Sequence, residues 1–358
     1  MRIIFDAYEL VLGQGKSIGI YNYAKNLLNA MTKVIDNNTE IIVICNASNR
    51  KDFTIEHTSV SQFIVSDSVP GKFSRLAWFF GQAALNVKKL AGDIYFSPKG
   101  FLPIGINYFS PNIKTVIVIH DLIPLWYADH HPGYFGRLEE LFINTSIVSS
   151  IKRTDKIIAI SKTTADDITA RFGCENTISV VHNGITTFPP SERKYAFPYI
   201  FAMASQLPHK NAAGVLAAYQ TYRDLVANPL PLVFCGVTET NQPGVIAVKG
   251  INDNDLHACY AFADLFVFLS LIEGFGFPPI EALAHGTPVL CSDIPSLREI
   301  GKDFATYVDP TKPDLAAKKI ATLLTENNSA SLKLARTAFS QEYSWTQCAS
   351  KILMAINC

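Results

Sequence analysis

Short runs of apolar, β-favouring residues alternate with stretches of helical periodicity along almost the whole chain. Runs of this kind, bounded by turn residues, indicate strands that are buried on both faces of a sheet. Strands are predicted at residues 3–5, 41–45, 63–66, 115–119, 155–160, 178–181, 199–204, 232–235, 245–248, 265–269 and 288–291. Because helices separate most of these strands, the pattern predicts an α/β architecture with parallel sheets.

The length of the chain and one polar segment predict how it is divided. At 358 residues the chain is too long for one ordinary hydrophobic core. The polar, proline-bearing segment that begins at Pro189 is the best candidate for a linker. We expect a first domain over residues 1–188, a second over residues 189–340, and a C-terminal helix over residues 341–358. Within the two domains, helices are predicted at residues 21–31, 73–90, 133–152, 256–262, 314–324 and 331–339, and the C-terminal helix itself is predicted at 345–356.

Composition narrows the class of protein. Hydrophobic residues make up 48% of the chain and charged residues 17%, which favours a large core and argues against disorder. Lys plus Arg and Asp plus Glu number 31 each, and this balance argues against a nucleic-acid partner. The seven cysteines have no C-x-x-C spacing, so reduced thiols explain them better than disulfides or a zinc site.

The chain enters its first strand without a signal-peptide pattern, and no apolar run approaches the ~20 residues of a membrane span. We therefore expect a cytoplasmic protein. The predicted helix at 73–90 carries Arg75, Trp78, Lys88 and Lys89 beside a broad apolar face. It fits peripheral contact with a membrane, or a core-packed helix with a solvated basic end, which we favour because amphipathic helices are common.

One stretch combines several features of a phosphate-binding unit. The predicted strand at 265–269 is followed by a loop with Gly274 and Gly276, and Pro278 and Pro279 then begin a helix. Backbone N–H groups and the positive end of a helix dipole converge at such a loop. The two carboxylates nearby, Glu273 and Glu281, would repel a phosphate but can accept hydrogen bonds from sugar or ribose hydroxyls.

A second group of polar residues follows the predicted strand at 115–119. His120 and Asp121 come directly after this strand, and ligands in open α/β sheets lie beyond the carboxyl ends of strands. The pair can donate to and accept from sugar hydroxyls. A histidine that is satisfied by loop carbonyls is the alternative, and it is the less favoured one beside the two glutamates.

The segment 273–289, E-G-F-G-F-P-P-I-E-A-L-A-H-G-T-P-V, resembles the signature of retaining GT-B glycosyltransferases, closest to glycosyltransferase family 4. H-D-L-I-P at 120–124, N-G-I at 183–185, K-N at 210–211 and S-L-R-E at 296–299 extend the resemblance over nearly the whole chain. It implies two Rossmann-like domains facing a cleft, with the last helix packed back on the first domain. It also implies transfer of a hexose with retained configuration from a nucleotide-sugar to a glycan acceptor, without a cofactor or a required metal.

The resemblance also implies roles for individual residues. Glu273 would contact the donor sugar and Glu281 the ribose hydroxyls, while Lys210 would neutralise the leaving diphosphate. His120 would contact the donor sugar and take part in catalysis. Further donor-binding positions are implied for Asp121, Gly274, Phe275, Gly276 and Phe277.

Two elements depart from the family's pattern. The family usually has glycine and arginine where this chain has Ala204 and Ser205, so we keep Ser205 as a donor-binding candidate and His209 as a replacement positive contact. In the N-terminal glycine loop, Ile20 stands in place of the usual arginine. Gly19 is retained as a backbone contact to donor phosphate, although a plain flexible loop explains it equally well.

The sequence leaves several alternatives open. A D-x-D tripeptide at 253–255 resembles a metal site, but its position favours a helix N-cap at Asn252 with an acidic first turn. A glycoside hydrolase could use Glu273 and Glu281 as acid and base, and a non-catalytic sugar-nucleotide-binding protein is a further alternative.

The donor and acceptor are less determined still. The H-D-L-I-P and P-x-K-N elements resemble those of bacterial surface-polysaccharide mannosyltransferases, which favours GDP-mannose over a UDP-hexose or a deoxysugar donor. A lipid-linked glycan is the expected acceptor, as is usual in the family. The oligomeric state is not indicated by the sequence.

Overall fold

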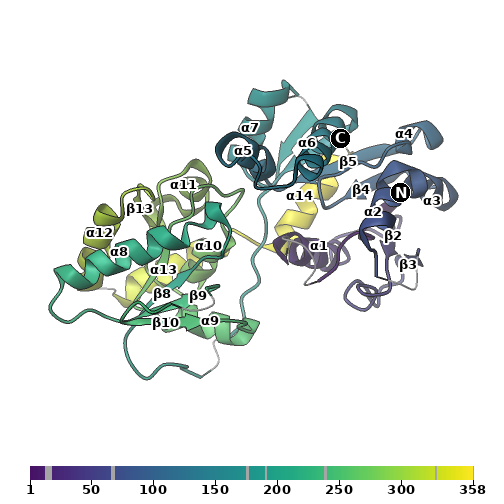
Figure 1. Ribbon diagram of the computed structural model, residues 1–358. Helices are drawn as coiled ribbons and strands as arrows, with labels where there is room; N and C mark the ends of the chain where they lie inside the picture. Colours follow the sequence, from purple (N-terminus) through teal and green to yellow (C-terminus); the bar gives the residue numbers. More distant parts are fainter. Residues whose placement is uncertain are drawn as a thin grey trace. The chain divides into compact units, whose positions relative to one another are not determined.

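The structure is a computed structural model that describes residues 1–12, 18–65, 69–174, 177–189, 192–237, 240–326 and 329–357. The chain forms two compact units (Figure 1). The first comprises Met1–Gly184 together with Trp345–Cys358, and the second comprises Ile185–Ser344. The first unit thus ends four residues before the expected boundary at 188, and the chain returns to it at Trp345.

The first unit contains a seven-stranded sheet in the order β3-β2-β1-β4-β5-β6-β7, and all of its neighbouring strands pair in parallel. Its strands are β1 (Arg2–Asp6), β2 (Glu40–Cys45), β3 (Val60–Ile64), β4 (Ile94–Ser97), β5 (Lys114–Ile119), β6 (Lys156–Ala159) and β7 (Ile178–Val180). The expected parallel α/β architecture is confirmed. The periodicity missed β4 because its four residues follow a helix closely, although all four are buried.

Helices cover both faces of this sheet and bury its apolar side chains. They are α1 (Ile18–Met31), α2 (Lys72–Ala77), α3 (Ala83–Leu90), α4 (Ile106–Phe109), α5 (Ile123–His130), α6 (Arg137–Arg153), α7 (Lys162–Phe172) and α14 (Trp345–Asn357). The C-terminal helix α14 packs against α1. Ser161 caps α7 by accepting a hydrogen bond from the Thr164 N–H, as expected from the sequence.

The helix predicted at 73–90 is not continuous. A π-helical segment, η1 (Trp78–Gln82), separates α2 from α3, and Gly81 within it has a φ of 146°. A residue with a side chain rarely adopts this backbone conformation, so the helix is interrupted at the glycine. The predicted helix at 133–152 also begins later, at Arg137, because Gly133 has a φ of 84°.

The second unit contains a six-stranded sheet in the order β10-β9-β8-β11-β12-β13, again with parallel pairings. Its strands are β8 (Ile200–Met203), β9 (Leu232–Cys235), β10 (Val245–Val248), β11 (Leu265–Phe268), β12 (Val289–Ser292) and β13 (Thr306–Val308). The sequence did not predict β13, whose first two residues are only partly buried.

The helices of the second unit are α8 (Ala212–Leu225), α9 (Asp253–Ala261), α10 (Phe277–Ala284), α11 (Pro295–Gly301), α12 (Pro313–Thr325) and α13 (Ala330–Ser340), with 3₁₀ turns η3 (Pro208–Lys210) and η4 (Lys302–Phe304). The side chain of Asn252 accepts from the Asp255 N–H at the start of α9, so the expected N-cap is confirmed. Helix α10 packs against α9 and α13. Within the described ranges, no helix is both long and apolar enough to cross a membrane.

Each sheet reverses its chain order at one point. In the first, β1 pairs with both β2 and β4; in the second, β8 pairs with both β9 and β11. Loops leave the strands on either side of this point in opposite directions and open a crevice at the carboxyl ends. The gaps after β1 and β4, and after β8 and β11, are therefore where ligands are expected.

Gly184 lets the two segments of the first unit meet. A Cβ at this position would lie 2.2 Å from the backbone nitrogen of Trp345 and 2.5 Å from its Cα. Both atoms belong to the backbone and cannot swing away. The glycine of the N-G-I motif is therefore required for close packing against the first residue of α14.

Gly184→Ala should lower the free energy of unfolding of the first unit by about 1–3 kcal/mol, the usual cost of overpacking. The three tryptophans, Trp78, Trp126 and Trp345, all lie in this unit, so their fluorescence during urea unfolding measures the change. Gly19→Ala is the control, because a Cβ there meets no atom of the described residues within 4 Å. Equal stabilities of the two variants would contradict the steric argument.

Candidate functional site

The site in the second unit forms where the loops after β8 and β11 meet. The Leu271 N–H donates to the His209 carbonyl oxygen at 2.7 Å, which joins the two loops directly. Both loops leave the carboxyl ends of strands that flank the reversal of chain order. His209 and Lys210 from one predicted motif are thereby brought together with Glu273 from another.

An ion pair lies at the centre of this junction. The Nζ of Lys210 is 2.7 Å from Oε1 of Glu273, and the side chains are 25% and 9% exposed. The same ammonium lies 5.9 Å from the ring centroid of Phe268. Because both charges are largely shielded from water, their attraction is stronger than that of a surface pair.

The residue after Lys210 is Asn211, and its backbone conformation and hydrogen bonds account for an asparagine at this position. Its φ of 52° lies in the left-handed region, which asparagine tolerates better than most residues. Its amide donates to the carbonyl oxygens of Leu269 at 2.8 Å and Pro310 at 3.1 Å, and its Oδ1 accepts from the Gly214 N–H. Asn211 therefore starts α8 and ties it to the end of β11, which fixes the backbone beside Lys210.

The glycine loop before α10 has a conformation that only glycine adopts easily. Gly276 has a φ of 105°, and a Cβ there would lie 2.4 Å from Cδ2 of Leu297. Phe275 is buried and packs against Tyr343 and Phe277. Pro278 and Pro279 follow Phe277 and have no N–H groups. The N–H groups of Gly276 and Phe277 are therefore the backbone donors immediately before the prolines.

Glu281 lies on α10 in surroundings that differ from those of Glu273. Its Oε2 accepts a hydrogen bond from the hydroxyl of Tyr260 on α9 at 3.1 Å. Burial raises the pKa of Glu281 to about 7, against the effect of the Tyr260 hydrogen bond, and Asp253 raises it further. Near neutral pH this carboxyl is therefore divided between its protonated and ionised forms.

Neither His209 nor Ser205 supplies a second positive charge beside Lys210. His209 is 5% exposed, and burial, with a further effect of Lys210, lowers its pKa to about 3. Its imidazole is neutral at physiological pH and adds no positive charge. Ser205 accepts a hydrogen bond from the Leu207 N–H at 3.4 Å within the same loop. Lys210 is the cation that the structure places at this junction.

In the first unit, His120 follows β5 at the sheet edge that holds the crevice. Its Nε2 lies 2.8 Å from the Pro98 carbonyl oxygen, and its ring meets the Tyr23 ring edge-on at 4.7 Å. Burial lowers the pKa of His120 to about 4, although the Pro98 hydrogen bond acts against this shift. The neutral ring must carry its proton on Nε2, because a carbonyl only accepts, and Nδ1 is then an acceptor.

The other two predicted residues of the first unit have simpler surroundings. Oδ1 of Asp121 accepts from the Ile123 N–H at 2.9 Å and so helps to start α5. Gly19 is the second residue of α1 and leaves open space around its Cα. The glycine loop at 13–17 that precedes it lies outside the described residues.

Sequence reasoning missed several polar residues at the same edge of the first sheet. Lys99 and Glu9 form an ion pair of 2.5 Å, with side chains 24% and 15% exposed, after the carboxyl ends of β4 and β1. Buried Asn46 and Asn49 donate to carbonyl oxygens of the segment 7–10 and hold the loop after β1. The strand-end rule would have identified Lys99 if β4 had been recognised.

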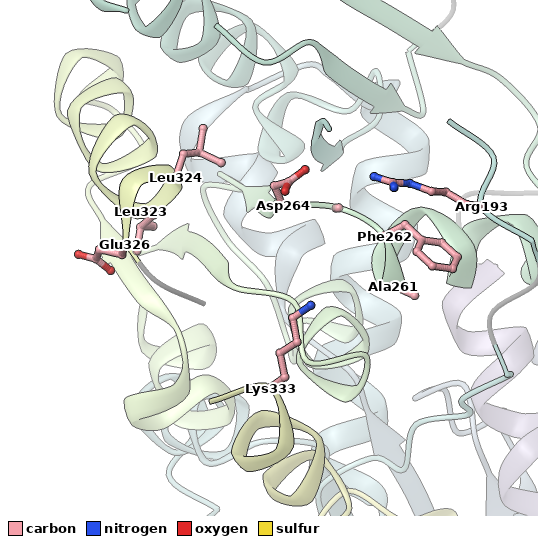
Figure 2. A pocket seen from close by; sticks show the side chains of 9 residues that line it. Arg193, Ala261, Phe262, Asp264, Leu323, Leu324, Glu326 and Lys333 are labelled. Atoms are coloured by element: carbon pink, nitrogen blue, oxygen red, sulfur yellow. The ribbon is translucent and has the colours of Figure 1, made fainter. Parts of the chain in front are cut away.

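A separate cavity of about 310 Å³ lies at the opposite, amino edge of the second sheet (Figure 2). It contains none of the predicted site residues, and its charged side chains are of both signs. Asp264 in its wall accepts from the Tyr199 N–H and holds the start of β8. The cavity is lined by Arg193, Ala261, Phe262, Ala263, Asp264, Leu323, Leu324, Glu326 and Lys333.

Both halves of the chain match known protein families. Residues 19–187 match the family described as Glycosyltransferase Family 4, and residues 185–340 match Glycosyl transferases group 1. The chain is 25% identical over 311 residues to the O-antigen chain mannosyltransferase RfbU of Salmonella typhimurium, covering 83% of this chain and 84% of that protein. It is 27% identical over 285 residues to the O-antigen chain mannosyltransferase B of Escherichia coli, covering 72% and 74%.

A solved structure shares the fold at lower sequence identity. The Anabaena protein HepE in complex with UDP-glucose superposes with a TM-score of 0.72 at 16% identity, covering 99% of both chains. A likeness at this level concerns the fold, and it confirms the expected architecture of two Rossmann-like units.

The buried imidazole of His120 predicts a dependence of stability on pH. The unfolded chain takes up a proton on this residue below about pH 6.5, while the folded form does so only near pH 4. The contribution of His120 is therefore complete above pH 6.5 and is lost as the pH falls toward 4. In His120→Gln, the free energy of unfolding should therefore change less with pH between pH 4 and 6.5. Unfolding followed by tryptophan fluorescence measures this dependence. Parallel curves for the two proteins would contradict the prediction.

Proposed function

The chain belongs to the family 4 glycosyltransferases, and we propose that it transfers a mannosyl residue from GDP-mannose to a growing glycan during assembly of a surface polysaccharide. The activity named for RfbU and for mannosyltransferase B supports mannose as the sugar. A UDP-hexose is the second candidate donor, because HepE, a structural neighbour over the whole chain, was solved with UDP-glucose.

The observation that carries this proposal is the Lys210–Glu273 ion pair at the reversal point of the second sheet. Lys210 stabilises the negative charge that develops on the departing diphosphate, the largest charge change in the reaction. Glu273 accepts hydrogen bonds from the sugar hydroxyls, and Glu281 accepts them from the ribose. The N–H groups of Gly276 and Phe277 contact the donor phosphates or sugar. The neutral His120 contacts the donor sugar.

We further propose that the transfer retains the anomeric configuration and does not require a metal ion. The chain offers no evident side chain as a covalent nucleophile, so the acceptor hydroxyl attacks the face from which the diphosphate departs. A phosphate oxygen of the donor takes the proton of that hydroxyl as the new glycosidic bond forms. Lys210 supplies the positive charge for the diphosphate, a task that a bound cation performs in other enzymes.

The test is to incubate the protein with GDP-mannose or UDP-glucose, with and without a mannose-containing acceptor. Acceptor-dependent release of GDP and an α-configured product by NMR would support the proposal, and EDTA should not change the rate. Hydrolysis of the sugar donor at the same rate with and without the acceptor would instead indicate a glycoside hydrolase. Binding without turnover would indicate a non-catalytic protein.

Lys210→Met should lower kcat by about 10²–10³-fold, the usual effect of removing a group that stabilises transition-state charge. Lys302→Met is the matched control, because Lys302 forms an exposed pair with Glu342 and lies outside the two site loops. A kcat within a factor of two of the wild type for Lys210→Met would refute the role of this residue.

We also propose that the first unit docks on the inner face of the cytoplasmic membrane, where a lipid-linked acceptor would lie. Large apolar side chains are exposed on α2, η1, α4 and α6. This exposed patch consists of Phe73 (87% exposed), Phe80 (59%), Tyr108 (82%), Leu138 (84%) and Leu141 (61%).

The surroundings of the exposed patch also suit an anionic surface. The Phe80 ring lies 6.1 Å from that of Phe142 on α6, which links η1 with α6. The exposed basic residues Lys72, Lys88 and Arg137 lie on α2, α3 and α6, the same group of elements. Aromatic rings and basic side chains together favour an anionic bilayer over a neutral one.

Phe73→Ser with Phe80→Ser should weaken binding to phosphatidylglycerol vesicles at least tenfold, since each buried aromatic ring contributes about 1.5–3 kcal/mol. Co-sedimentation measures the affinity, which should also fall as salt rises. Leu334→Ser is the control, because Leu334 is 71% exposed on α13 of the second unit. Equal binding by both variants would show that the exposed patch does not face the membrane.

A further inference from the structure

The side chain of Tyr260 is fixed in place behind Glu281. It is completely buried, and the rings of Phe201 and Phe266 meet it edge-on at 5.2 Å and 5.1 Å. Its carbonyl oxygen accepts from the Thr287 hydroxyl at 2.6 Å. With the ring and the backbone both held, the hydroxyl donates to Oε2 of Glu281 at 3.1 Å, while the other acceptor beside it, the thioether sulfur of Met203, is a weak one at 4.0 Å.

We propose that Tyr260 is a positioning residue for donor binding, which orients the Glu281 carboxyl through its hydrogen bond to Oε2 so that Oε1 can accept the ribose hydroxyls. Among the described residues, the hydrogen bond from Tyr260 is the one that the Glu281 side chain receives. This role rests on the proposed function, because it assigns a contact to the nucleotide of the donor. No motif pointed to Tyr260, since its partner lies 21 residues away on another helix.

Glu281 needs this support because its surroundings oppose ionisation. Burial raises its pKa to about 7, and a protonated carboxyl has one fewer oxygen site for accepting hydroxyl hydrogen bonds. The hydrogen bond from Tyr260 stabilises the ionised form and lowers the pKa of Glu281, while Asp253 in the first turn of α9 raises it. Tyr260 is therefore the group that partly offsets the burial of this carboxylate.

The other titratable groups packed near Tyr260 do not change charge in the same pH range. The Nδ1 of His257 on α9 lies 2.7 Å from Nε2 of His285, which follows α10. The His285 ring lies nearly parallel to that of Tyr260, with centroids 6.4 Å apart. Burial lowers the pKa of His257, and it lowers that of His285 to about 4. Both imidazoles are therefore mainly neutral at pH 7. Burial also raises the pKa of the neighbouring thiols, Cys235 and Cys259, that of Cys259 to about 11, so the titration expected around pH 7 is that of Glu281.

The test is to measure the affinity of the full chain for GDP-mannose by calorimetry from pH 5.5 to 9. Tyr260→Phe should weaken binding roughly tenfold at pH 7 and raise the midpoint of the acidic limb by about one pH unit. At pH 9, where the carboxyl is ionised in both proteins, the difference should shrink to about twofold. The kcat should change much less than the KM for the donor.

Two variants separate positioning from a general loss of structure. Tyr199→Phe removes another buried hydroxyl of the second unit, one that donates to the Cys259 carbonyl at 3.0 Å and does not contact Glu281. It should lower the melting temperature without moving the midpoint of the pH profile. Glu281→Gln cannot ionise and should remove the acidic limb, both as a single variant and when it is combined with Tyr260→Phe.

The outcomes distinguish the positioning role from the proposed function. If the wild-type protein binds GDP-mannose and Tyr260→Phe keeps the same midpoint, or if its binding is still roughly tenfold weaker at pH 9, the positioning role is wrong. If the wild-type protein binds neither GDP-mannose nor UDP-glucose, the proposed function fails, and the assignment of Glu281 to the ribose of the donor fails with it. Titration of the Glu281 carboxyl by ¹³C NMR without ligand then shows which step was wrong, because Tyr260→Phe should raise its pKa in either case.

Discussion

The parallel direction of the strands is the constraint on which both units depend. Because every strand within a sheet points the same way, the loops that follow strands gather at one edge and those that precede them at the other. The reversal of chain order between β8 and β11 then separates two of these loops and leaves room between them. Lys210 and Glu273, 63 residues apart in the chain, meet at that point.

Two glutamates eight positions apart acquire different properties from this arrangement. Glu273 forms an ion pair with the ammonium of Lys210. Glu281 accepts a hydrogen bond from a tyrosine hydroxyl, and its burial raises its pKa to about 7. The same residue type can therefore counter a cation at one position and remain sensitive to pH at the other.

Glycines mark the places where the backbone approaches other atoms closely. Gly276 has a positive φ and packs under Leu297, while Gly184 leaves no room for a side chain against Trp345. Gly81 interrupts a helix whose apolar pattern is otherwise continuous. At each position the absence of Cβ is a requirement of packing or conformation, and the flanking hydrophobic pattern gives no indication of it.

The amino-acid sequence was enough to predict the class of fold, most of the strands and the identity of the motif residues. Buried parallel strands need long apolar runs, and a glycine loop before a proline-started helix is a local feature that can be recognised without a structure. It did not determine β4 or β13, because strands of three or four residues leave too little pattern.

Which side chains meet, and what charge they bear, depends on how the chain packs. The Tyr260–Glu281 hydrogen bond, the Lys99–Glu9 pair and the neutral state of His209 all depend on contacts between distant segments. Burial, which is a property of the packed molecule, sets the pKa values that separate a cation from a neutral donor. For that reason His209, which the sequence offered as a replacement for a missing arginine, is a neutral residue in the folded chain.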